Sequence, residues 1–529
     1  MNWLRTLNSR FRSSPKVAAP AAELSEELRQ LIARRDTSAL QDWLQRLRTD
    51  PNTPEVPLLI EEARRADWPA KEVTRLEVFA HFYRGNLAEA LRLSSEYTGA
   101  LTFDGDFFLI AMLCLYNQGR FDDAWQLLSS AGGDESLIAK RADYAVIAAL
   151  VCQVSNHLDD MKRYIDLARR LAPTDTVAAL NAYYMYFELG EMEAFERVRQ
   201  EFENGQHPID QAGFALAIVD LAQDNYERGF ELLELRYQMT EASRYVNPAL
   251  FPLRRWQGEP PAGNVLLLSS EQGFGDTVQM ARYLPELQQI GFRRLVMEAQ
   301  PESLTLLQFN FPEIDFVIQK WREVPARAFD CWTGLVSLPH LLKTTTSNVP
   351  GQSGYLHVPP ENEAYWRARV AELTTGKRLR IGLAWSGFPG HRADRRRSIP
   401  FPRMMDAIRD QDVDFFALQT HVPPGFPENL INVSEELVTL SDTAALIAEM
   451  DLVIAVDTSV VHLAGAIGKE TWLLLPYRYE WRWGLEGEGN HWYDSVKVLR
   501  QARRGDWDGL LEDVFGKRLP ARASSKGNA

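Results

Sequence analysis

Residues 265–283, which read VLLLSSEQGFGDTVQMARY, decide the fold of the C-terminal half of this chain. The apolar run 265–268 predicts a buried strand, and an amphipathic helix follows it. Between them lies the turn GFGD at 273–276. Glycine lets the backbone approach a ligand closely, and the start of a helix offers unpaired N–H groups. The stretch is therefore typical of one half of an α/β nucleotide-binding site, in which Asp276 either caps the helix or faces a substrate.

Strand-like runs and helical stretches alternate on either side of this motif. A helix predicted at 365–373 divides them into two series. The runs lie at 265–268, 295–297 and 316–318 in the first series, and at 379–385, 413–418, 452–456 and 471–475 in the second. Such alternation predicts parallel sheets, which bind ligands at the carboxyl ends of their strands. We therefore expect two Rossmann-like lobes that face each other across a cleft.

The N-terminal half is helical and repetitive. Its predicted helix breaks lie at Gly85, Gly119, Asn156, Gly190 and Asp224, with steps of 34, 37, 34 and 34 residues. Two positions after each break an apolar residue starts the next helix, namely Leu87, Phe121, Leu158, Met192 and Tyr226. A turn residue that tolerates positive φ ends a helix in this way. The segment resembles tetratricopeptide repeats, whose concave face holds a peptide or protein partner; a structural brace is the alternative.

Composition excludes several classes of protein. A net charge of −14 argues against a general binder of nucleic acid or anionic membranes. The three cysteines are too widely spaced for a disulfide framework or a zinc site, and they predict buried thiols in a reducing cytosol. No run reaches the roughly 18 to 20 apolar residues of a membrane helix. We therefore expect a cytoplasmic protein with a disordered basic arm at 1–22, a membrane-touching arm being the alternative.

A second turn of the same kind follows the run 452–456. There the sequence reads Asp457-Thr458-Ser459 and continues into a helix that carries His462. The N–H groups at the start of that helix favour a phosphate. Asp457 either caps the helix or accepts hydrogen bonds from sugar hydroxyls, and His462 is either structural or turned toward the ligand.

A basic segment, SGFPGHRADRRRSIPF at 386–401, follows the predicted strand 379–385 in an acidic chain. Because it leaves the end of a strand, it is placed to neutralise a diphosphate, which the guanidinium fork binds well. A solvated surface is the alternative. The candidate donor contacts from this segment are Ser386, His391, Arg395, Arg396 and Arg397.

Three motifs taken together point to a family. The segments EQGFGDTVQMARYLPEL (271–287), WSGFPGHRADRRRSIPF (385–401) and DTSVVHLAGAIGKETWLLLPYRYEWRWG (457–484) resemble tetratricopeptide-fused glycosyltransferases of the heptosyltransferase-like GT-B group. The resemblance covers residues 78–501, with Phe388 where asparagine is common and Glu470 where proline is usual.

This resemblance implies an inverting, metal-independent enzyme that uses a nucleotide-diphospho-sugar as co-substrate and needs no other cofactor. Asp276 is then the candidate general base, and the turn at Asp457 and Thr458 binds the donor. The close-approach turn of Gln272, Gly273 and Gly275 leaves room for sugar and acceptor. The aromatic residues Tyr479, Trp481 and Trp483 either stack on the nucleotide base or pack in the protein.

The predicted fold is α + α/β, an all-α solenoid followed by a GT-B pair of lobes. We expect a basic arm at 1–22, repeats at 23–240, a linker at 241–263, the acceptor-side lobe at 264–360, the nucleotide-sugar lobe at 361–515 and a disordered tail at 516–529. The leading function is glycosylation of a protein, such as a bacterial flagellar or surface subunit, held by the repeats. A lipopolysaccharide-type transferase and a non-catalytic scaffold are the alternatives.

Overall fold

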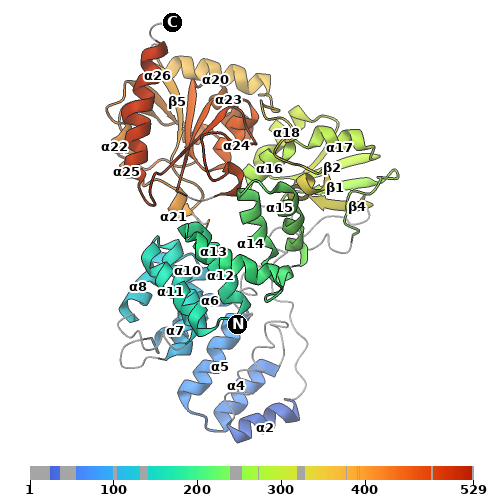
Figure 1. Ribbon diagram of the computed structural model, residues 1–529, viewed down its shortest axis with the longest axis vertical. Helices are drawn as coiled ribbons and strands as arrows, with labels where there is room; N and C mark the ends of the chain where they lie inside the picture. Colours follow the sequence, from blue (N-terminus) through green and yellow to red (C-terminus); the bar gives the residue numbers. More distant parts are fainter. Residues whose placement is uncertain are drawn as a thin grey trace. The chain divides into compact units, whose positions relative to one another are not determined.

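The fold is that of a computed structural model, which describes most of the chain (Figure 1). The described residues are 24–35, 55–98, 104–131, 141–238, 253–271, 273–318, 328–376, 378–389, 391, 394–477 and 480–526. They form two compact units, Met1–Ile209 and Asp210–Ala529. The boundary falls about one helix pair before the expected end of the repeats at 240, so the last helix pair belongs to the second unit. The predicted arm at 1–22 lies outside the described residues.

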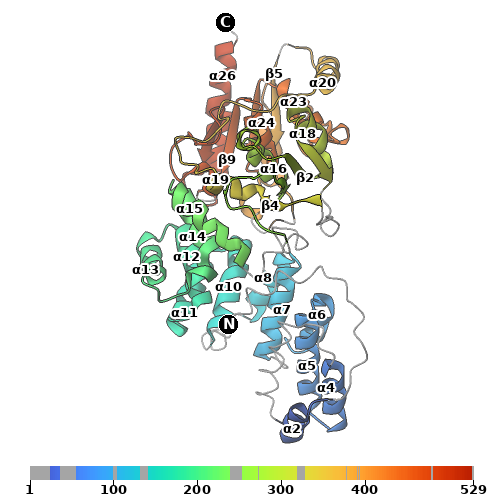
Figure 2. The same cartoon turned by 90° about the vertical axis from the view of Figure 1, so that its right-hand side faces the viewer.

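The first unit is helical wherever the structure describes it. Its helices are α2 (Glu26–Arg34), α4 (Glu55–Arg65), α5 (Ala70–Tyr83), α6 (Leu87–Ser95), α7 (Gly105–Asn117), α8 (Phe121–Ala131), α10 (Ala142–Val154), α11 (Leu158–Leu171), α12 (Thr176–Leu189) and α13 (Met192–Glu203). Successive helices pack on each other, as α5 on α6 and α10 on α11 (Figure 2).

The predicted turns of the repeats are confirmed. All five turn residues have positive φ, at 82° for Gly85, 72° for Gly119, 61° for Asn156, 69° for Gly190 and 62° for Asp224. The apolar residue two positions later is the first residue of the next helix in every pair. The first helices of the pairs form the core, in which Tyr183 and Tyr186 are buried.

The second unit begins with α14 (Ile209–Ala222), α15 (Tyr226–Leu233) and the 3₁₀ helix η2 (Glu234–Gln238). A four-stranded parallel sheet follows in the order β3-β2-β1-β4. Its strands are β1 (Val265–Ser269), β2 (Arg294–Ala299), β3 (Asp315–Ile318) and β4 (Cys331–Gly334), joined by α16 (Phe274–Ala281), α17 (Leu284–Ile290), α18 (Leu304–Asn310) and α19 (Leu338–Leu341). The three strands expected here are confirmed, and β4 is additional.

The second sheet has six parallel strands in the order β10-β9-β8-β5-β6-β7. The strands are β5 (Leu379–Ala384), β6 (Val413–Ala417), β7 (Leu430–Ile431), β8 (Leu452–Val456), β9 (Thr471–Leu475) and β10 (Val496–Arg500). Its helices are α20 (Pro360–Leu373), α21 (Asp394–Arg397), α22 (Phe401–Ile408), α23 (Leu440–Ala448), α24 (Ser459–Ala466), α25 (Trp507–Leu511) and α26 (Leu519–Lys526). The predicted disordered tail is wrong as far as Lys526, because α26 is a helix anchored by the buried Leu519.

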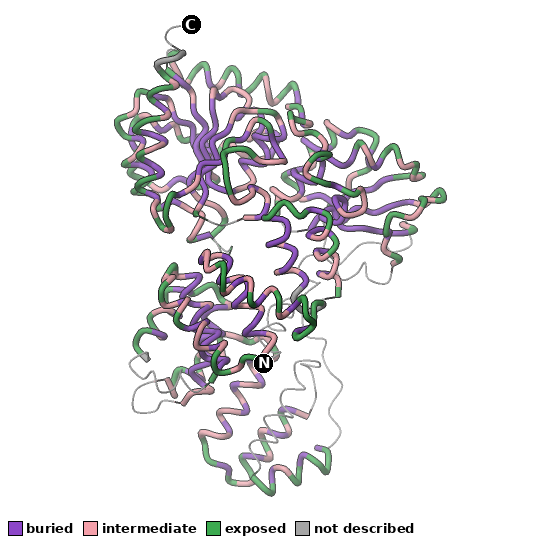
Figure 3. The backbone as a smooth tube through the Cα atoms, viewed as in Figure 1, coloured by how far each residue is buried: buried purple, intermediate pink, exposed green. Residues whose placement is uncertain are grey.

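Helices cover both faces of this second sheet, so its central strands β8 and β9 are buried along their whole length (Figure 3). One face packs against α22 and α25 in a single apolar core, and α24 packs against β8 and β9. A strand buried on both faces must be apolar throughout, which explains the continuous runs in the sequence. Among the described residues, no helix has the length and apolar character required to cross a bilayer.

The strand order places the three motifs at the carboxyl edges of the two sheets, where the order of the strands reverses. In the first sheet the chain runs outward from β1 through β2 to β3, and then returns to β4 on the other side of β1. In the second sheet it runs from β5 to β7 and returns to β8 beside β5. Ligands of open α/β sheets bind at the carboxyl edge where the order reverses. The segments that follow β1, β5 and β8 therefore carry the candidate site.

Candidate active site

Asp276 lies in the first turn of α16, directly after the carboxyl end of β1. Its Oδ2 accepts a hydrogen bond from the N–H of Gly273 at 3.1 Å, so it caps the helix. Its Oδ1 pairs with the Nη2 of Arg482, which belongs to the second lobe. The capping role and the contact with the second lobe therefore occur together. Gln272 lies outside the described residues.

Arg482 joins the two lobes and was not among the predicted site residues. Besides Asp276, it donates from Nε to Gln279 Oε1 at 2.6 Å and from Nη1 to Glu480 Oε1 at 3.0 Å. Its guanidinium also lies 4.4 Å from the ring centroid of Trp481. Because the side chain is only 10% exposed, these charge-assisted contacts act in a poorly solvated setting.

Asp457 follows β8 and is buried. Its Oδ1 accepts a hydrogen bond from the indole Nε1 of Trp483 at 3.0 Å, and its carbonyl oxygen accepts one from Arg397 Nη1 at 2.8 Å. Burial raises the pKa of Asp457, while the charges of Arg397 and Arg482 oppose the rise. The carboxylate does not cap α24, since the N-cap residue is Thr458. The cap role considered for Asp457 is therefore wrong.

The start of α24 retains an unused polar group. Thr458 makes no side-chain capping bond, and its Oγ1 is buried without a hydrogen-bond partner among the described residues. Ser459 begins the helix behind it. Unpaired N–H groups, an unsatisfied hydroxyl and the helix dipole all favour an anionic acceptor at this position.

Glu480 is a third carboxylate of the cluster and was also not predicted. Burial raises the pKa of Glu480 to about 7, with Asp457 and Asp276 adding to the rise and Arg482 opposing it. Its Oε1 also accepts a hydrogen bond from the N–H of Trp481 at 2.9 Å. Like charges that share one guanidinium cannot all ionise freely, so this glutamate takes up a proton near neutral pH.

Gly275 serves a contact between the lobes rather than a ligand. A Cβ at this position would lie 2.8 Å from Cδ2 of His462 and 3.6 Å from the Cα of Ser459. The glycine therefore lets the starts of α16 and α24 approach each other, and the two helices pack side by side (Figure 1, Figure 2). The expectation that Gly275 makes room for sugar and acceptor is wrong. A Cβ on Gly273 would meet only Asp276 Oδ2 within 4 Å, at 3.8 Å, so there is open space beside Gly273.

His462 belongs to this packing. It is buried, and its Nδ1 lies 3.0 Å from the hydroxyl of Tyr493. Burial lowers the pKa of His462 well below its usual value, and the nearby charges of Arg482 and Arg282 lower it further. The imidazole is therefore neutral and packs beside Gly275 where the lobes meet, which is the structural role considered from the sequence.

The basic segment reaches the site through Arg397. This side chain is 13% exposed and bonds both Asp394 Oδ1, at 3.2 Å, and the carbonyl of Asp457. Arg396 is half-buried on the same short helix α21, whereas Arg395 and His391 are exposed. Among the described residues, Arg397 is thus joined to the residue that precedes the N-cap of α24.

Ser386 lies at the carboxyl end of β5 and is organised by Gln419, which follows β6. The side-chain oxygen of Gln419 accepts the N–H groups of Trp385 at 2.9 Å and Ser386 at 3.1 Å. Its amide nitrogen donates to the hydroxyl of Ser386 at 3.2 Å. One amide thereby holds the two neighbouring strand ends in register.

Of the two roles considered for Trp481 and Trp483, packing in the protein agrees with the structure and stacking on a nucleotide base does not. Both indoles are buried, at 3% and 0% exposed. Trp481 packs against Phe230 and Trp492 with ring centroids 5.8 Å and 5.7 Å away. Trp483 orients Asp457 instead, and Tyr479 lies outside the described residues.

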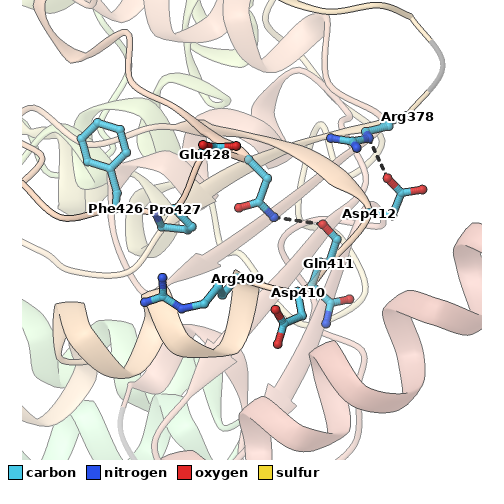
Figure 4. Close-up of a pocket in the computed structure, with 9 residues that line it drawn as sticks. Arg378, Arg409, Asp410, Gln411, Asp412, Phe426, Pro427 and Glu428 are labelled. Carbon is cyan, nitrogen blue, oxygen red and sulfur yellow. Dashed lines mark hydrogen bonds and ion pairs between the residues drawn. The ribbon is translucent and has the colours of Figure 1, made fainter.

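A polar cavity of about 710 Å³ lies elsewhere, at the amino ends of β5 and β6 (Figure 4). Arg378 and Asp412 form an ion pair of 2.6 Å at its edge. The cavity is at the opposite end of the strands from Asp457 and does not belong to the site. Within the ranges that the structure describes, no three His, Cys, Asp or Glu side chains are grouped to hold a metal ion.

Comparisons with known proteins give one curated relative and several solved structures. No family model matches the chain. Protein FlbA of Caulobacter vibrioides (strain ATCC 19089 / CIP 103742 / CB 15) is 27% identical over 467 residues, which cover 82% of this chain and 76% of FlbA. This identity is compatible with a shared architecture along most of the chain.

Three of the similar solved structures cover about half of the chain. A glycosyl transferase family 9 protein from Veillonella parvula DSM 2008 is 12% identical, covering 51% of this chain and 99% of its own length, with a TM-score of 0.34. The ADP-heptose lps heptosyltransferase II of E. coli is 12% identical over 50% of this chain and 99% of its own, with a TM-score of 0.37. The iron-containing dodecameric glycosyltransferase TibC of E. coli is 13% identical, covering 52% of this chain and 80% of its own length, with a TM-score of 0.31.

Proposed function

We propose that this chain is a glycosyltransferase that moves a sugar from a nucleotide-diphospho-sugar to an acceptor hydroxyl, with inversion and without a metal ion. One observation carries the proposal: at the carboxyl edges of two parallel sheets, Asp276 binds Arg482, and Asp457 lies within electrostatic reach of both. The sequence motifs around these residues are those that resemble the heptosyltransferase-like group.

Asp276 is the proposed general base. Its carboxylate accepts two hydrogen bonds, which leaves lone pairs on both oxygens for an acceptor hydroxyl. As the acceptor oxygen bonds to the anomeric carbon, its proton passes to Asp276. The bond from that carbon to the diphosphate breaks, and its electron pair leaves on the phosphate oxygen. Attack from the face opposite the leaving group inverts the anomeric centre.

The second lobe is the proposed binding site of the leaving diphosphate. The start of α24 supplies N–H groups and the hydroxyl of Thr458, while Arg397 places a guanidinium beside it. Preorganised donors of this kind stabilise charge as it develops, because they need no reorganisation at the moment of reaction. Ser386 and the half-buried Arg396 are the next candidates along the same edge.

The acceptor is proposed to be a protein presented by the helical repeats of the first unit. Such arrays offer long surfaces to extended partners, which is the property that a protein substrate requires. The three buried free cysteines support a reducing compartment for the reaction. A flagellar or surface subunit, modified before export, fits both considerations.

Nucleotide binding tests the donor half of this proposal. We expect one nucleoside diphosphate or nucleotide sugar from a panel to raise Tm, with about 2.7 kcal/mol of stabilisation at 100-fold excess over Kd. Thr458→Val should weaken that stabilisation, because it removes the free hydroxyl and keeps the volume. If no nucleotide or nucleotide sugar of the panel raises Tm, the proposed glycosyltransferase activity is refuted.

Asp276→Asn tests the chemistry. The variant should lose release of nucleoside diphosphate in the presence of a cell extract as acceptor, while nucleotide binding persists. Asp442→Asn is the matched control, since Asp442 caps α23 through the N–H of Thr439 at 2.9 Å in the same way. Turnover that survives in Asp276→Asn as it does in the control would exclude Asp276 as the base.

A further inference from the structure

A buried carboxylate lies directly before the turn at 273–276, called the catalytic turn below because it carries the proposed base Asp276. Glu271 follows β1, is 1% exposed and precedes Asp276 by five positions. Its Oε2 accepts a hydrogen bond from the N–H of Val336 at 3.0 Å. A Cβ on Gly334, the last residue of β4, would lie only 2.1 Å from that same oxygen. The carboxylate is therefore enclosed by the ends of the two strands between which the strand order reverses.

Its principal partner comes from the helical part of the chain. Arg236 lies on η2, directly after α15, and is 1% exposed. It binds Glu271 with two parallel bonds, from Nε to Oε1 and from Nη2 to Oε2, each 3.0 Å long. A bidentate pair of this kind fixes direction as well as distance.

The remaining donors of Arg236 are also used. Nη1 bonds the carbonyl of Leu233 at 3.0 Å and Glu234 Oε1 at 2.7 Å, and Nη2 bonds Ser337 Oγ at 2.7 Å. Its guanidinium lies 4.1 Å from the ring centroid of Tyr237. Every hydrogen-bonding direction is thus occupied, and the helix end is fastened to the loops after β1 and β4.

The charges of this cluster are balanced. Glu234 also pairs with Arg255 at 2.6 Å, so two guanidinium groups face two carboxylates. Burial raises the pKa of Glu271, and the charge of Arg236 opposes that rise. Removing one member leaves an uncompensated charge in a buried position, which the loop relieves only by moving or by admitting water.

We propose that Arg236 is a positioning residue for the catalytic turn: through Glu271, the last helix pair holds the segment from which Asp276 faces Arg482. Glu271 is separated from Gly273, whose N–H binds Asp276, by one residue. Displacement of Glu271 therefore displaces the N-cap of α16. The inference rests on the proposed role of Asp276, but the positioning itself is measurable without any substrate.

Hydrogen exchange on the full-length protein tests the positioning. In Arg236→Lys, which keeps the charge and loses the fork, we expect the amides of 273–283 to exchange about ten-fold faster or more. The control is Arg228→Lys on α15, whose partner Asp220 lies 3.4 Å away and whose side chain is 35% exposed. Amides of α20 and α23 in the second lobe should keep their rates in both variants.

Glu271→Gln provides the same test from the other side and preserves the shape if Arg236→Lys does not fold. Unchanged exchange at 273–283 in a folded variant would overturn the proposal. Equal acceleration over both lobes would also overturn it, because that reports a general loss of stability. In the active enzyme, kcat should fall about ten-fold or more while KM for the nucleotide sugar stays within about two-fold. A wild-type protein without turnover would contradict the proposed function and leave the exchange result standing.

Discussion

Gly275→Ala places one methyl group in the contact between α16 and α24. The added Cβ would lie 2.8 Å from Cδ2 and 3.5 Å from Nε2 of His462, and 3.6 Å from the Cα of Ser459. The imidazole has little freedom to withdraw, because it is 5% exposed and its Nδ1 lies 3.0 Å from the hydroxyl of Tyr493. The substitution therefore overpacks the junction between the lobes.

Two effects of opposite sign set the magnitude. Alanine in place of glycine within a helix stabilises by about 0.5–1 kcal/mol. Overpacking a close contact costs about 1–3 kcal/mol. The clash prevails, and we expect a net loss of about 1 kcal/mol in the free energy of unfolding. Urea titration followed by tryptophan fluorescence measures it, since Trp481, Trp483 and Trp492 are buried around this junction.

A double-mutant cycle with His462→Ala identifies the cause. If the imidazole is the obstacle, the two substitutions should couple favourably by about 1 kcal/mol, because the second removes the clash. Gly273→Ala is the control: losing a glycine N-cap should cost up to about 1 kcal/mol, but it should not couple to His462→Ala, because a Cβ at Gly273 would lie near Asp276 Oδ2 and not near the imidazole. An unchanged stability in Gly275→Ala, with weaker nucleotide binding, would show that the glycine accommodates a ligand and would refute the packing argument.

Three further predictions concern the ion cluster and the helix pair. Burial raises the pKa of Glu480 to about 7 from an ordinary 4.5, so the folded protein holds a proton that the unfolded chain releases. Between pH 4.5 and 7 the contribution of Glu480 to the free energy of unfolding should therefore fall as pH rises. The urea midpoint of Glu480→Gln should fall less between pH 5 and pH 7.5 than that of the wild type. Arg482→Met leaves the half-buried carboxylates of Asp276 and Glu480 without their shared guanidinium, and we expect a loss of about 2–3 kcal/mol by urea titration, below the cost for a fully buried pair; a loss below 1 kcal/mol would mean that the cluster does not join the lobes. A chain that starts at residue 205 should unfold cooperatively by circular dichroism, whereas one that starts at 241 lacks Arg236 and should not; equal behaviour would make the last helix pair dispensable.

The repeats were predictable because their signal is local. A residue that tolerates positive φ and an apolar residue two positions later specify a helix–turn–helix unit within a few residues. The long buried strands were predictable for a similar reason, since each is a continuous apolar run. The missed strands lack that signal: β4 reads CWTG, β7 has two residues, and β10 alternates polar and apolar residues. Pairing with a longer neighbour makes each of them a strand.

The division between the two compact units differs from the expected end of the repeats, because it depends on contacts distant in sequence. The period of the repeats continues through α15, so the pattern alone assigns this helix to the array. Its side chains instead pack on the rest of the second unit, with Tyr226 stacked 5.8 Å from Trp492 and Phe230 edge-on to Trp481. Arg236 adds the buried pair with Glu271. No local pattern indicates that these residues meet.

Asp276 and Asp457 were predicted from the sequence, but Arg482, which interacts with both, was not. The geometry of one short turn explains why. Trp481 and Trp483 stand two apart, a spacing that suggests a shared face in an extended chain. Residues 481–483 instead form a 3₁₀ turn, in which successive side chains diverge by about 120°. Trp481 therefore turns to α15, Arg482 to Asp276, and Trp483 to Asp457. A single turn thus holds the helix pair, the proposed base and the donor-side aspartate, so Trp483→Phe should disturb Asp457 while Trp481→Phe disturbs α15. Identical effects of the two substitutions on nucleotide binding would contradict this division.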